Sequence, residues 1–229
     1  IVAARRSRVL ISTIYPGDGR VTMDWASATA RIQHAPDWTV INPSGLPYDS
    51  ARNVAARLCL DQGFGWLFFV DSDVLVPPDI IYKLLATGRD LVGALYFKRG
   101  DNYPPAAATL VATPEDKLNP FKPAPLPRFN YGDILPVDFL PTGATLISRR
   151  CLEAVVQAFV HPFEWGMDPA GFGPFIGSNG QPLPGLSEDF MFSFRAKQLG
   201  FQPWLHTGVV CSHEMTGWVG VKGLQAPER

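Results

Sequence analysis

The sequence predicts an α/β fold with a mainly parallel central sheet and helices on both faces. Short apolar, β-branched segments alternate with segments of helical period, which is the pattern of parallel strands joined by helices. The chain has 229 residues, of which 46% are hydrophobic and 18% charged, so it can form one large core and is not a disordered or coiled-coil protein. Its 21 glycines and 22 prolines indicate that much of the remainder is ordered loop.

The first strand and the first helix are predicted from apolar patterning and from the residues at their ends. Residues 9–15 form a β-branched apolar run that stops at the turn-forming segment 16–19, as expected of a buried strand entering a loop. The helix that follows has Asp49 or Ser50 as its N-cap and Gly63 beyond its C-terminus. Its apolar positions repeat with the helical period at Ala51, Val54, Ala55 and Leu58.

A strand, an acidic loop and a second helix come next. Residues 66–70 are a fully apolar strand that ends directly in Asp71, Ser72 and Asp73. Pro77 and Pro78 then open a helix, where proline is favoured because the first turn needs no backbone donor. The apolar face of this helix consists of Ile80, Ile81, Leu84 and Leu85.

The second half continues the alternation, interrupted by two long segments without a usable period. Strands are predicted over residues 91–97, over 137–148 as two short strands or one bent strand around Gly143, and over 201–213 as one or two strands. Helices are predicted over 150–159 and over 187–200, the latter with Ser187 as N-cap and Gly200 at its end. Residues 100–135 and 161–186 are expected to be long structured loops, which in compact domains usually carry function.

Charge and cysteine content exclude several classes of partner. A net charge of −1 provides no field for a polyanion, so nucleic acid is not a favoured partner. The cysteines Cys59, Cys151 and Cys211 lie in apolar surroundings, which predicts reduced core residues and a cytoplasmic protein. The longest apolar stretch, residues 64–70, is far shorter than the roughly 20 residues of a membrane helix, so a soluble protein without a membrane span is expected.

Asp71 and Asp73 are the strongest candidates for a functional site. Two carboxylates directly after a buried strand are costly unless they bind a cation or an ion partner, although a turn cap before Pro77 is a simpler explanation. The carboxyl ends of parallel strands are where ligands bind, and Mg²⁺ or Mn²⁺ is usually held there by one or two carboxylates together with phosphate oxygens. The pair therefore predicts a divalent cation and a nucleotide diphosphate.

Two further groups are ambiguous when each is considered alone. Glu188 and Asp189 begin the last predicted helix, where carboxylates complement the helix dipole without any further function. His213 lies at the end of the last predicted strand, where a histidine is more often structural than a metal ligand.

Taken together, these segments resemble the GT-A nucleotide-sugar glycosyltransferases, especially small family-2-like members, over most of the chain. The segments that carry the resemblance are Ser50-Ala51-Arg52-Asn53, Phe68-Phe69-Val70-Asp71-Ser72-Asp73 as the DxD motif, Leu91-Val92-Gly93-Ala94-Leu95-Tyr96, Pro141-Thr142-Gly143 with Leu146-Ile147, Ser187-Glu188-Asp189-Phe190 as the ED motif, and Cys211-Ser212-His213. The resemblance implies a single GT-A, Rossmann-like domain over residues 1–229. In it, residues 1–100 would form the nucleotide-binding half and residues 101–229 the acceptor-binding half.

The resemblance also implies a role for each matching residue. Asp73 and His213 are expected to bind Mn²⁺ or Mg²⁺, together with Asp71, which would contact the ribose or a metal-bound water. Asp189 would be the general base of an inverting hexosyltransferase-like reaction, with Glu188 orienting the acceptor or supporting Asp189. The donor, a nucleotide-diphosphate sugar, would be held by Thr13, Tyr15, Arg52, Asn53, Asp71, Ser72 and Gly143.

Some features depart from the family pattern and leave the substrates open. The loop after the first strand lacks the acidic pattern that commonly binds uracil, so the base of the nucleotide is not specified. The acceptor is a carbohydrate or another hydroxyl compound, with a modified base in DNA as a less favoured case. The segment 161–186 matches no known motif. Its aromatic residues either stack on a ligand or form a small core of their own; they are Phe163, Trp165, Phe172 and Phe175.

Two other functions share parts of the pattern. Haloacid-dehalogenase-like phosphatases also have an apolar strand ending in DxD, with the first aspartate as nucleophile. In those enzymes the motif lies near the start of the chain, whereas here it follows seventy residues, and Leu75 stands where that family has Thr or Val. A non-catalytic module that binds nucleotide-sugars or glycans is the second alternative, against which the intact acidic residues and His213 argue.

Overall fold

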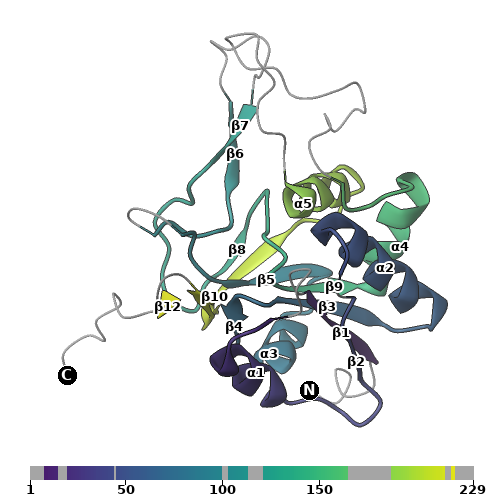
Figure 1. Cartoon of the computed structure of the whole chain (residues 1–229). Helices are drawn as coiled ribbons and strands as arrows, with labels where there is room; N and C mark the ends of the chain where they lie inside the picture. Colours follow the sequence, from purple (N-terminus) through teal and green to yellow (C-terminus); the bar gives the residue numbers. More distant parts are fainter. Residues whose placement is uncertain are drawn as a thin grey trace.

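A seven-stranded sheet forms the centre of the protein, with strand order β2-β1-β3-β9-β5-β10-β8 (Figure 1). This computed structural model describes residues 8–14, 20–43, 45–99, 103–112, 121–164, 187–214 and 218–219. The strands of the sheet are β1 (Val9–Ile14), β2 (Thr39–Ile41), β3 (Trp66–Asp71), β5 (Leu91–Leu95), β8 (Ile134–Pro136), β9 (Ala144–Ser148) and β10 (Trp204–Val210). The α/β fold class predicted from the sequence is confirmed.

Most strands of this sheet share one direction, as predicted. Strand β1 pairs in parallel with β2 and β3, and β5 pairs in parallel with β10. Strand β9 lies antiparallel between β3 and β5, and β8 lies antiparallel on β10. Because β9 comes from the second half of the chain and separates two strands of the first half, the halves proposed from the sequence are interleaved in one sheet.

Helices cover both faces of the sheet, as predicted (Figure 1). One face carries α2 (Tyr48–Asp61), α4 (Arg149–Ala158) and α5 (Glu188–Gln198), and the other carries α1 (Met23–Ala30) and α3 (Ile80–Ala86). The predicted apolar face of α3 is buried against the sheet; it consists of Ile80, Ile81, Leu84 and Leu85. No helix within the described ranges is long and apolar enough to cross a bilayer.

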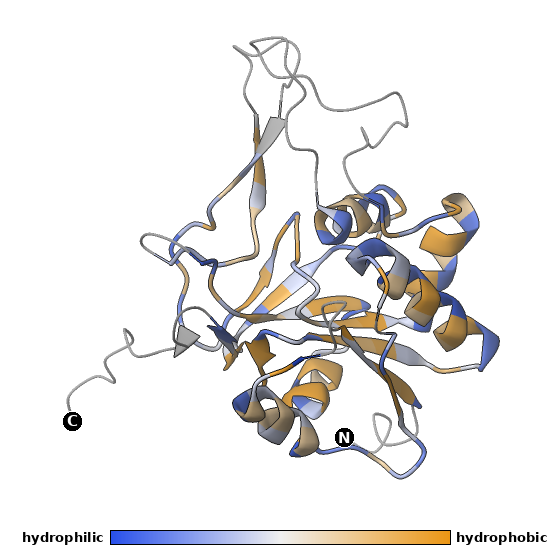
Figure 2. Cartoon of the chain, viewed as in Figure 1, coloured by the Kyte–Doolittle hydropathy of each residue, from blue (hydrophilic) through white to orange (hydrophobic). Residues whose placement is uncertain are grey.

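The core has two parts, one on each side of the sheet. Alternate residues of β1 point to opposite faces, so Leu10 packs in the cluster that contains α2, and Ile11 packs in the cluster that contains α3. Figure 2 shows the central strands as predominantly hydrophobic, while the helices combine hydrophobic and hydrophilic residues. The three cysteines are free and buried, as predicted; they are Cys59, Cys151 and Cys211.

Helix ends follow the sequence signals except at the starts of α2 and α3. Helix α3 begins at Ile80 with Asp79 as its N-cap, so Pro77 and Pro78, which were predicted to open it, both precede it. Helix α2 begins at Tyr48 with Pro47 as its N-cap, so the predicted caps Asp49 and Ser50 both lie within its first turn. The reason is local: Asp49 accepts a hydrogen bond from the neighbouring Ser50 N–H (2.7 Å), and Pro47 already has the extended conformation of a cap. The predicted glycines are confirmed, because Gly63 and Gly200 follow α2 and α5 with φ of 70° and 87°.

The sequence prediction is wrong for part of the segment 100–135. Strands β6 (Thr109–Ala112) and β7 (Phe121–Ala124) pair antiparallel and extend away from the main sheet, and β8 lies in the same segment (Figure 1). These strands are short and β7 contains Pro123, so they carry neither a clear alternation nor a typical strand composition. Within residues 137–148 only β9 is a strand, while Phe139 forms an isolated bridge with Ala108.

A small second sheet brings two distant parts of the chain together. Strand β11 (Ser212–Glu214) pairs antiparallel with β4 (Val74–Leu75) and with β12 (Trp218–Val219). The register places His213 opposite Val74, the residue that follows Asp73. The DxD segment and the last histidine, 140 residues apart in the chain, thus meet through backbone pairing.

Candidate functional site

A cavity of about 430 Å³ lies beyond the ends of β3 and β5, where the sequence placed the site. Segments from six parts of the chain line it: the end of β3 with the turn that follows, the segment after β5, the residues before β6 and before β9, the start of α5, and strand β11. Its charged and histidine side chains are Asp71, Asp73, Lys98, Arg99, Asp189 and His213. Predicted acidic residues therefore do converge, and they share the cavity with two basic residues.

Asp71 is held rigidly at the end of β3. Its backbone N–H donates to Gly143 O (3.1 Å), and its carbonyl accepts from the Trp25 indole (2.8 Å). Its side-chain Oδ2 accepts from Arg52 Nη2 (3.0 Å), whereas Oδ1 is buried without a hydrogen-bond partner among the described residues. Burial raises the pKa of Asp71, although Arg52 opposes that change.

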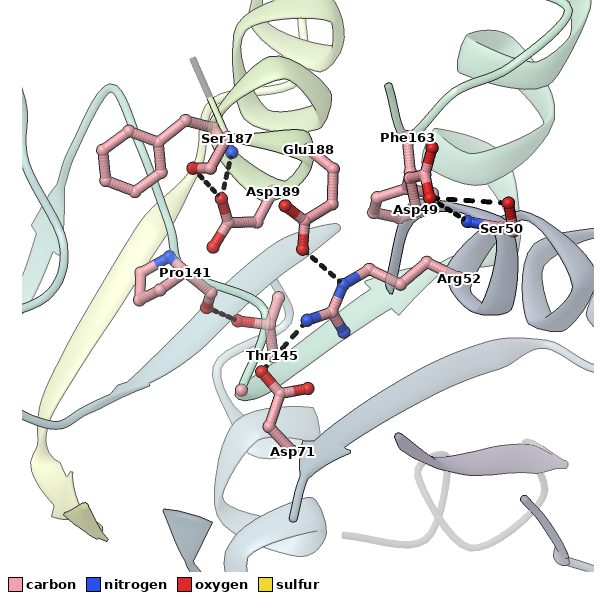
Figure 3. A network of polar contacts seen from close by, with 12 residues as sticks. Asp49, Ser50, Arg52, Asp71, Pro141, Thr145, Phe163, Ser187, Glu188 and Asp189 are labelled. Carbon is pink, nitrogen blue, oxygen red and sulfur yellow. Dashed lines mark hydrogen bonds and ion pairs between the residues drawn. The ribbon is translucent and has the colours of Figure 1, made fainter. Parts of the chain in front are cut away.

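Arg52 joins two carboxylates beneath the cavity (Figure 3). It projects from α2, is 2% exposed, and contacts both Asp71 and Glu188, the latter through Nε and Oε1 at 3.1 Å. Burial alone would lower its pKa, but Asp71 and then Glu188 raise the pKa above its ordinary value, so the guanidinium is charged. These contacts differ from the nucleotide contact expected of Arg52, and that contact stays a prediction.

Thr13 and Asn53, also predicted to bind the nucleotide, are not among the described residues that line the cavity. Thr13 is buried and its hydroxyl contacts Asn42 and the carbonyl of Ile41. Asn53 uses both ends of its amide on the Phe163 backbone, at 2.7 and 3.0 Å. Tyr15 lies outside the described residues. Thr13 and Asn53 thus fasten neighbouring segments in this structure.

Phe163, the first aromatic residue of the unmatched segment, belongs to the core. Its ring is fully buried, stacks on Phe192 at 4.5 Å between centroids, and meets Phe69 edge-on at 5.5 Å. Phe163 thus packs in the main core with residues of β3 and α5, and not in a separate core of its own segment. The other three aromatics lie outside the described residues; they are Trp165, Phe172 and Phe175.

Asp73 and His213 face each other in the cavity, and their contact requires a proton or a bound cation between them. His213 Nδ1 lies 2.8 Å from the Phe97 carbonyl, which can only accept, so Nδ1 carries a proton. In the neutral ring, Nε2 therefore has a lone pair, and it lies 3.4 Å from Asp73 Oδ2. Two lone pairs facing each other repel, so either a proton on Nε2 or a bound cation is required.

The pKa values of the pair reflect this attraction. Burial alone would lower the pKa of His213, but the hydrogen bonds with Asp73 and Phe97 outweigh burial and raise it. Burial would likewise raise the pKa of Asp73, yet His213 and then Arg99 lower it below its ordinary value. Their contact thus favours the charged form of each group.

Two basic residues in the cavity were missed by the sequence prediction. Arg99 pairs through Nη2 with Asp73 Oδ2 and donates from Nε to the Glu214 carbonyl (2.8 Å). Lys98 Nζ lies 5.9 Å from the centroid of the Phe190 ring. The signal was present, because both residues directly follow the apolar run 91–97 and so lie at the same sheet edge as Asp71.

The acidic pair at the start of α5 is divided between cavity and interior (Figure 3). Asp189 lines the cavity, and its Oδ1 accepts hydrogen bonds from the Ser187 hydroxyl and from Phe190 N–H (2.7 Å). Glu188 is 5% exposed and faces Arg52. Burial, and then the charge of Asp189, raise the pKa of Glu188 to about 6 against the opposing effect of Arg52.

Gly143 and Ser72 shape the floor of the site through their backbones. Gly143 N–H donates to Tyr96 Oη (3.0 Å), and a Cβ at Gly143 would lie only 2.6 Å from that oxygen. The structure thus supplies a reason for glycine that involves Tyr96, whereas close passage of a donor sugar stays a prediction. Ser72 N–H donates to Ile14 O (3.0 Å) and fixes the turn between the two aspartates.

The donor set fits a divalent cation only in part. Within the described ranges, no three His, Cys, Asp or Glu side chains gather as a metal-binding group, so the predicted trio of Asp71, Asp73 and His213 is not assembled. The physical reason is that Arg52 draws Asp71 away as an ion-pair partner. Asp73 with His213 still suits Mn²⁺ or Mg²⁺, because such ions take few protein ligands when phosphate supplies the others.

Comparisons with known proteins address the fold. No protein-family model matches the chain, and no match was found among curated proteins. A solved structure, the crystal structure of A197 from STIV, is similar with a TM-score of 0.54 and 17% sequence identity. The similarity covers 91% of this chain and 86% of that chain, so the two share an α/β fold over nearly their whole length.

Gly143→Ala is expected to destabilise the protein, and Tyr96→Phe is expected to relieve part of that loss. The new methyl group would collide with Tyr96 Oη, which typically costs about 1–3 kcal/mol in a packed core. Tyr96→Phe alone leaves Gly143 N–H without its partner, at about 1–3 kcal/mol. In urea unfolding, the double variant should lose less free energy of unfolding than the two single variants lose together. If the two losses are strictly additive, the contact between position 143 and Tyr96 Oη is contradicted.

Glu188 should make the protein less stable as pH rises through about 6. Its pKa in the folded protein is about 6, above the ordinary 4.5, so the folded state binds more protons between these values. Stability from this residue is complete below pH 4.5 and is lost above about 6, by on the order of 1 kcal/mol. Urea unfolding of the wild type and of Glu188→Gln, measured across this pH range, checks the prediction. It is contradicted if the wild type gains free energy of unfolding relative to Glu188→Gln as the pH rises.

Proposed function

We propose that this protein is a metal-dependent glycosyltransferase that moves a sugar from a nucleotide-diphosphate sugar to a hydroxyl acceptor. The observation that carries the proposal is one cavity that combines two features. Asp73 and His213 face each other with room for a proton or a cation between them, and Asp189 is a carboxylate without an ion-pair partner among the described residues. The resemblance of six ordered segments to the GT-A glycosyltransferases supports it. The α/β fold shared with A197 is compatible with it.

Asp73 and His213 would hold the cation, Mn²⁺ or Mg²⁺. When bound, that cation neutralises charge developing on the diphosphate leaving group. The backbone carbonyl of Phe97 fixes the His213 ring so that Nε2 is the nitrogen offered to the cation. Asp71, which lines the cavity and is held by Arg52, would contact the ribose of the donor or a metal-bound water.

Asp189 would accept the proton of the acceptor hydroxyl. The hydrogen bonds described for its carboxylate both end on Oδ1, so the remaining oxygen, Oδ2, is the one suited to take the proton. As the proton leaves, the acceptor oxygen bonds to the anomeric carbon while the bond from that carbon to the diphosphate breaks. Glu188 does not touch the cavity; it fixes the start of α5 through Arg52 and so supports Asp189.

A panel of nucleotide-sugars with and without Mn²⁺ tests the whole proposal. A donor that binds the folded protein raises its melting temperature by mass action, and the shift should require the cation. Sugar transfer or slow hydrolysis of the stabilising donor separates an enzyme from a binding module without turnover. Release of phosphate from simple monoesters would instead favour a phosphatase.

Asp73→Asn should reduce Mn²⁺ affinity by at least about 10-fold, because the amide cannot supply the negative charge that the cation needs. Titration calorimetry with Mn²⁺ measures this. Asp90→Asn is a matched control, since Asp90 is a similarly exposed carboxylate paired with an arginine, Arg150, outside the cavity. Sugar transfer that persists in excess EDTA would contradict the metal requirement.

Asp189→Asn should lower kcat by at least about 100-fold while donor affinity stays nearly unchanged, because the amide keeps the size of the side chain but cannot take a proton. A carboxylate that only complements the helix dipole would contribute about 0.3–1 kcal/mol to stability and nothing to the rate. Single-turnover kinetics and donor titration distinguish these cases. A variant that changes only in melting temperature would favour a retaining mechanism without this base.

A further inference from the structure

Lys98 and Arg99 are the cations of the cavity, and neither has a role in the reaction outlined above. They follow β5 directly, and both face the cavity that contains Asp71, Asp73 and Asp189. Three carboxylates share this space with the two basic side chains and with His213, so without the basic pair the carboxylates would dominate the charge of the cavity. The basic pair therefore lowers the repulsion that an anionic ligand would meet there.

Arg99 and a divalent cation would compete for the same oxygen. Arg99 Nη2 contacts Asp73 Oδ2, which is also the oxygen that lies 3.4 Å from His213 Nε2. A cation bound by Asp73 and His213 would stand next to the guanidinium and repel it. Binding of the cation at this position thus requires Arg99 to release Asp73.

Arg99 is built so that its guanidinium can change partners without being lost from the site. Its side chain is 52% exposed, whereas Nε donates to the Glu214 carbonyl at 2.8 Å. Glu214 is in turn tied to the DxD turn, because its N–H donates to Asp73 O (2.7 Å). The stem of Arg99 is therefore anchored beside the cation position while its terminal nitrogens can reorient.

Lys98 provides a second positive charge in the cavity. Its ammonium group lies 5.9 Å from the centroid of the Phe190 ring at the start of α5, whereas Arg99 contacts Asp73 in the turn after β3. An anion between the two basic residues would meet a flexible ammonium on one side and a planar guanidinium on the other. Guanidinium groups bind phosphate oxygens through two hydrogen bonds, and lysine acts as a point charge.

We propose that Lys98 and Arg99 form the diphosphate-binding subsite of the donor, and that Arg99 leaves Asp73 for the diphosphate when a divalent cation binds Asp73 and His213. This inference rests on the proposed function. Without ligands, Arg99 neutralises the charge of Asp73. When the cation and the diphosphate bind, the cation neutralises Asp73, and the released guanidinium of Arg99 compensates the charge of the phosphate groups. The number of unpaired charges in the cavity thus stays small in both states.

The exchange predicts effects of opposite sign from one substitution. Arg99→Ala should strengthen binding of Mn²⁺ alone, because the competing guanidinium is gone from Asp73. The same variant should bind inorganic pyrophosphate in the presence of Mg²⁺ about 10- to 100-fold more weakly, as expected for a lost charge-assisted hydrogen bond. Lys98→Ala should weaken the binding of pyrophosphate by a similar factor. It should change the affinity for Mn²⁺ less than Arg99→Ala does.

Calorimetric titrations of Mn²⁺ and of pyrophosphate with Mg²⁺ measure both effects on the full chain. Arg99→Lys, which keeps the charge, should restore part of the pyrophosphate affinity. Arg150→Ala is the matched control, since Arg150 is an exposed arginine paired with Asp90 outside the cavity, and its substitution should alter neither titration. Melting temperatures verify that each variant is folded.

The outcomes separate this inference from the proposed function. If Mn²⁺ binding depends on Asp73 but Arg99→Ala weakens Mn²⁺ binding or leaves pyrophosphate binding unchanged, the partner exchange is overturned and the proposed function stands. If the wild type binds neither pyrophosphate nor any nucleotide-sugar with a divalent cation present, the proposed function itself fails. If Arg99→Ala binds Mn²⁺ more tightly and pyrophosphate more weakly than the wild type does, the exchange is supported.

Discussion

Arg52 places a guanidinium inside the protein, where an unpaired charge would cost several kcal/mol. Its two carboxylate partners come from β3 and α5, so one side chain from α2 joins three elements that are far apart in the sequence. Loss of the guanidinium would leave two buried carboxylates without their ion-pair partner, and this cost favours one arrangement of the strand end and the helix start. The positions of both Asp71 and Asp189 depend on that arrangement.

The ion pairs of Arg52 give the two aspartates of the DxD turn different surroundings. Asp71 is committed to Arg52, and burial raises its pKa, whereas Asp73 lies among mobile or titratable partners that lower its pKa. Arg99 and His213 can both exchange for another cation without leaving a buried charge behind, because each is partly exposed to solvent. The interior aspartate is thus suited to fixing geometry, and the outer one to binding and releasing a cation.

The acidic parts of the site could be predicted because carboxylates directly after an apolar strand are costly, which marks Asp71 and Asp73 in the sequence alone. The ion-pair network beneath these aspartates, which consists of Arg52 and Glu188, could not be predicted. Arg52 lies on the buried side of an amphipathic helix, and Glu188 precedes a residue that faces the cavity, so helical period alone assigns neither. Strands β6 and β7 were missed because their pairing, and not their composition, makes them strands.

The antiparallel strand β9 explains how the floor of the cavity keeps its shape. By entering between β3 and β5, it brings the turn at Gly143 to the sheet edge that carries Asp71 and Tyr96. Gly143 then accepts from the Asp71 backbone and donates to Tyr96 Oη, so the ends of three adjacent strands are linked through one residue. Only glycine leaves room for the tyrosine oxygen. A larger residue would therefore push apart the strand ends that carry the cavity, even without touching a ligand.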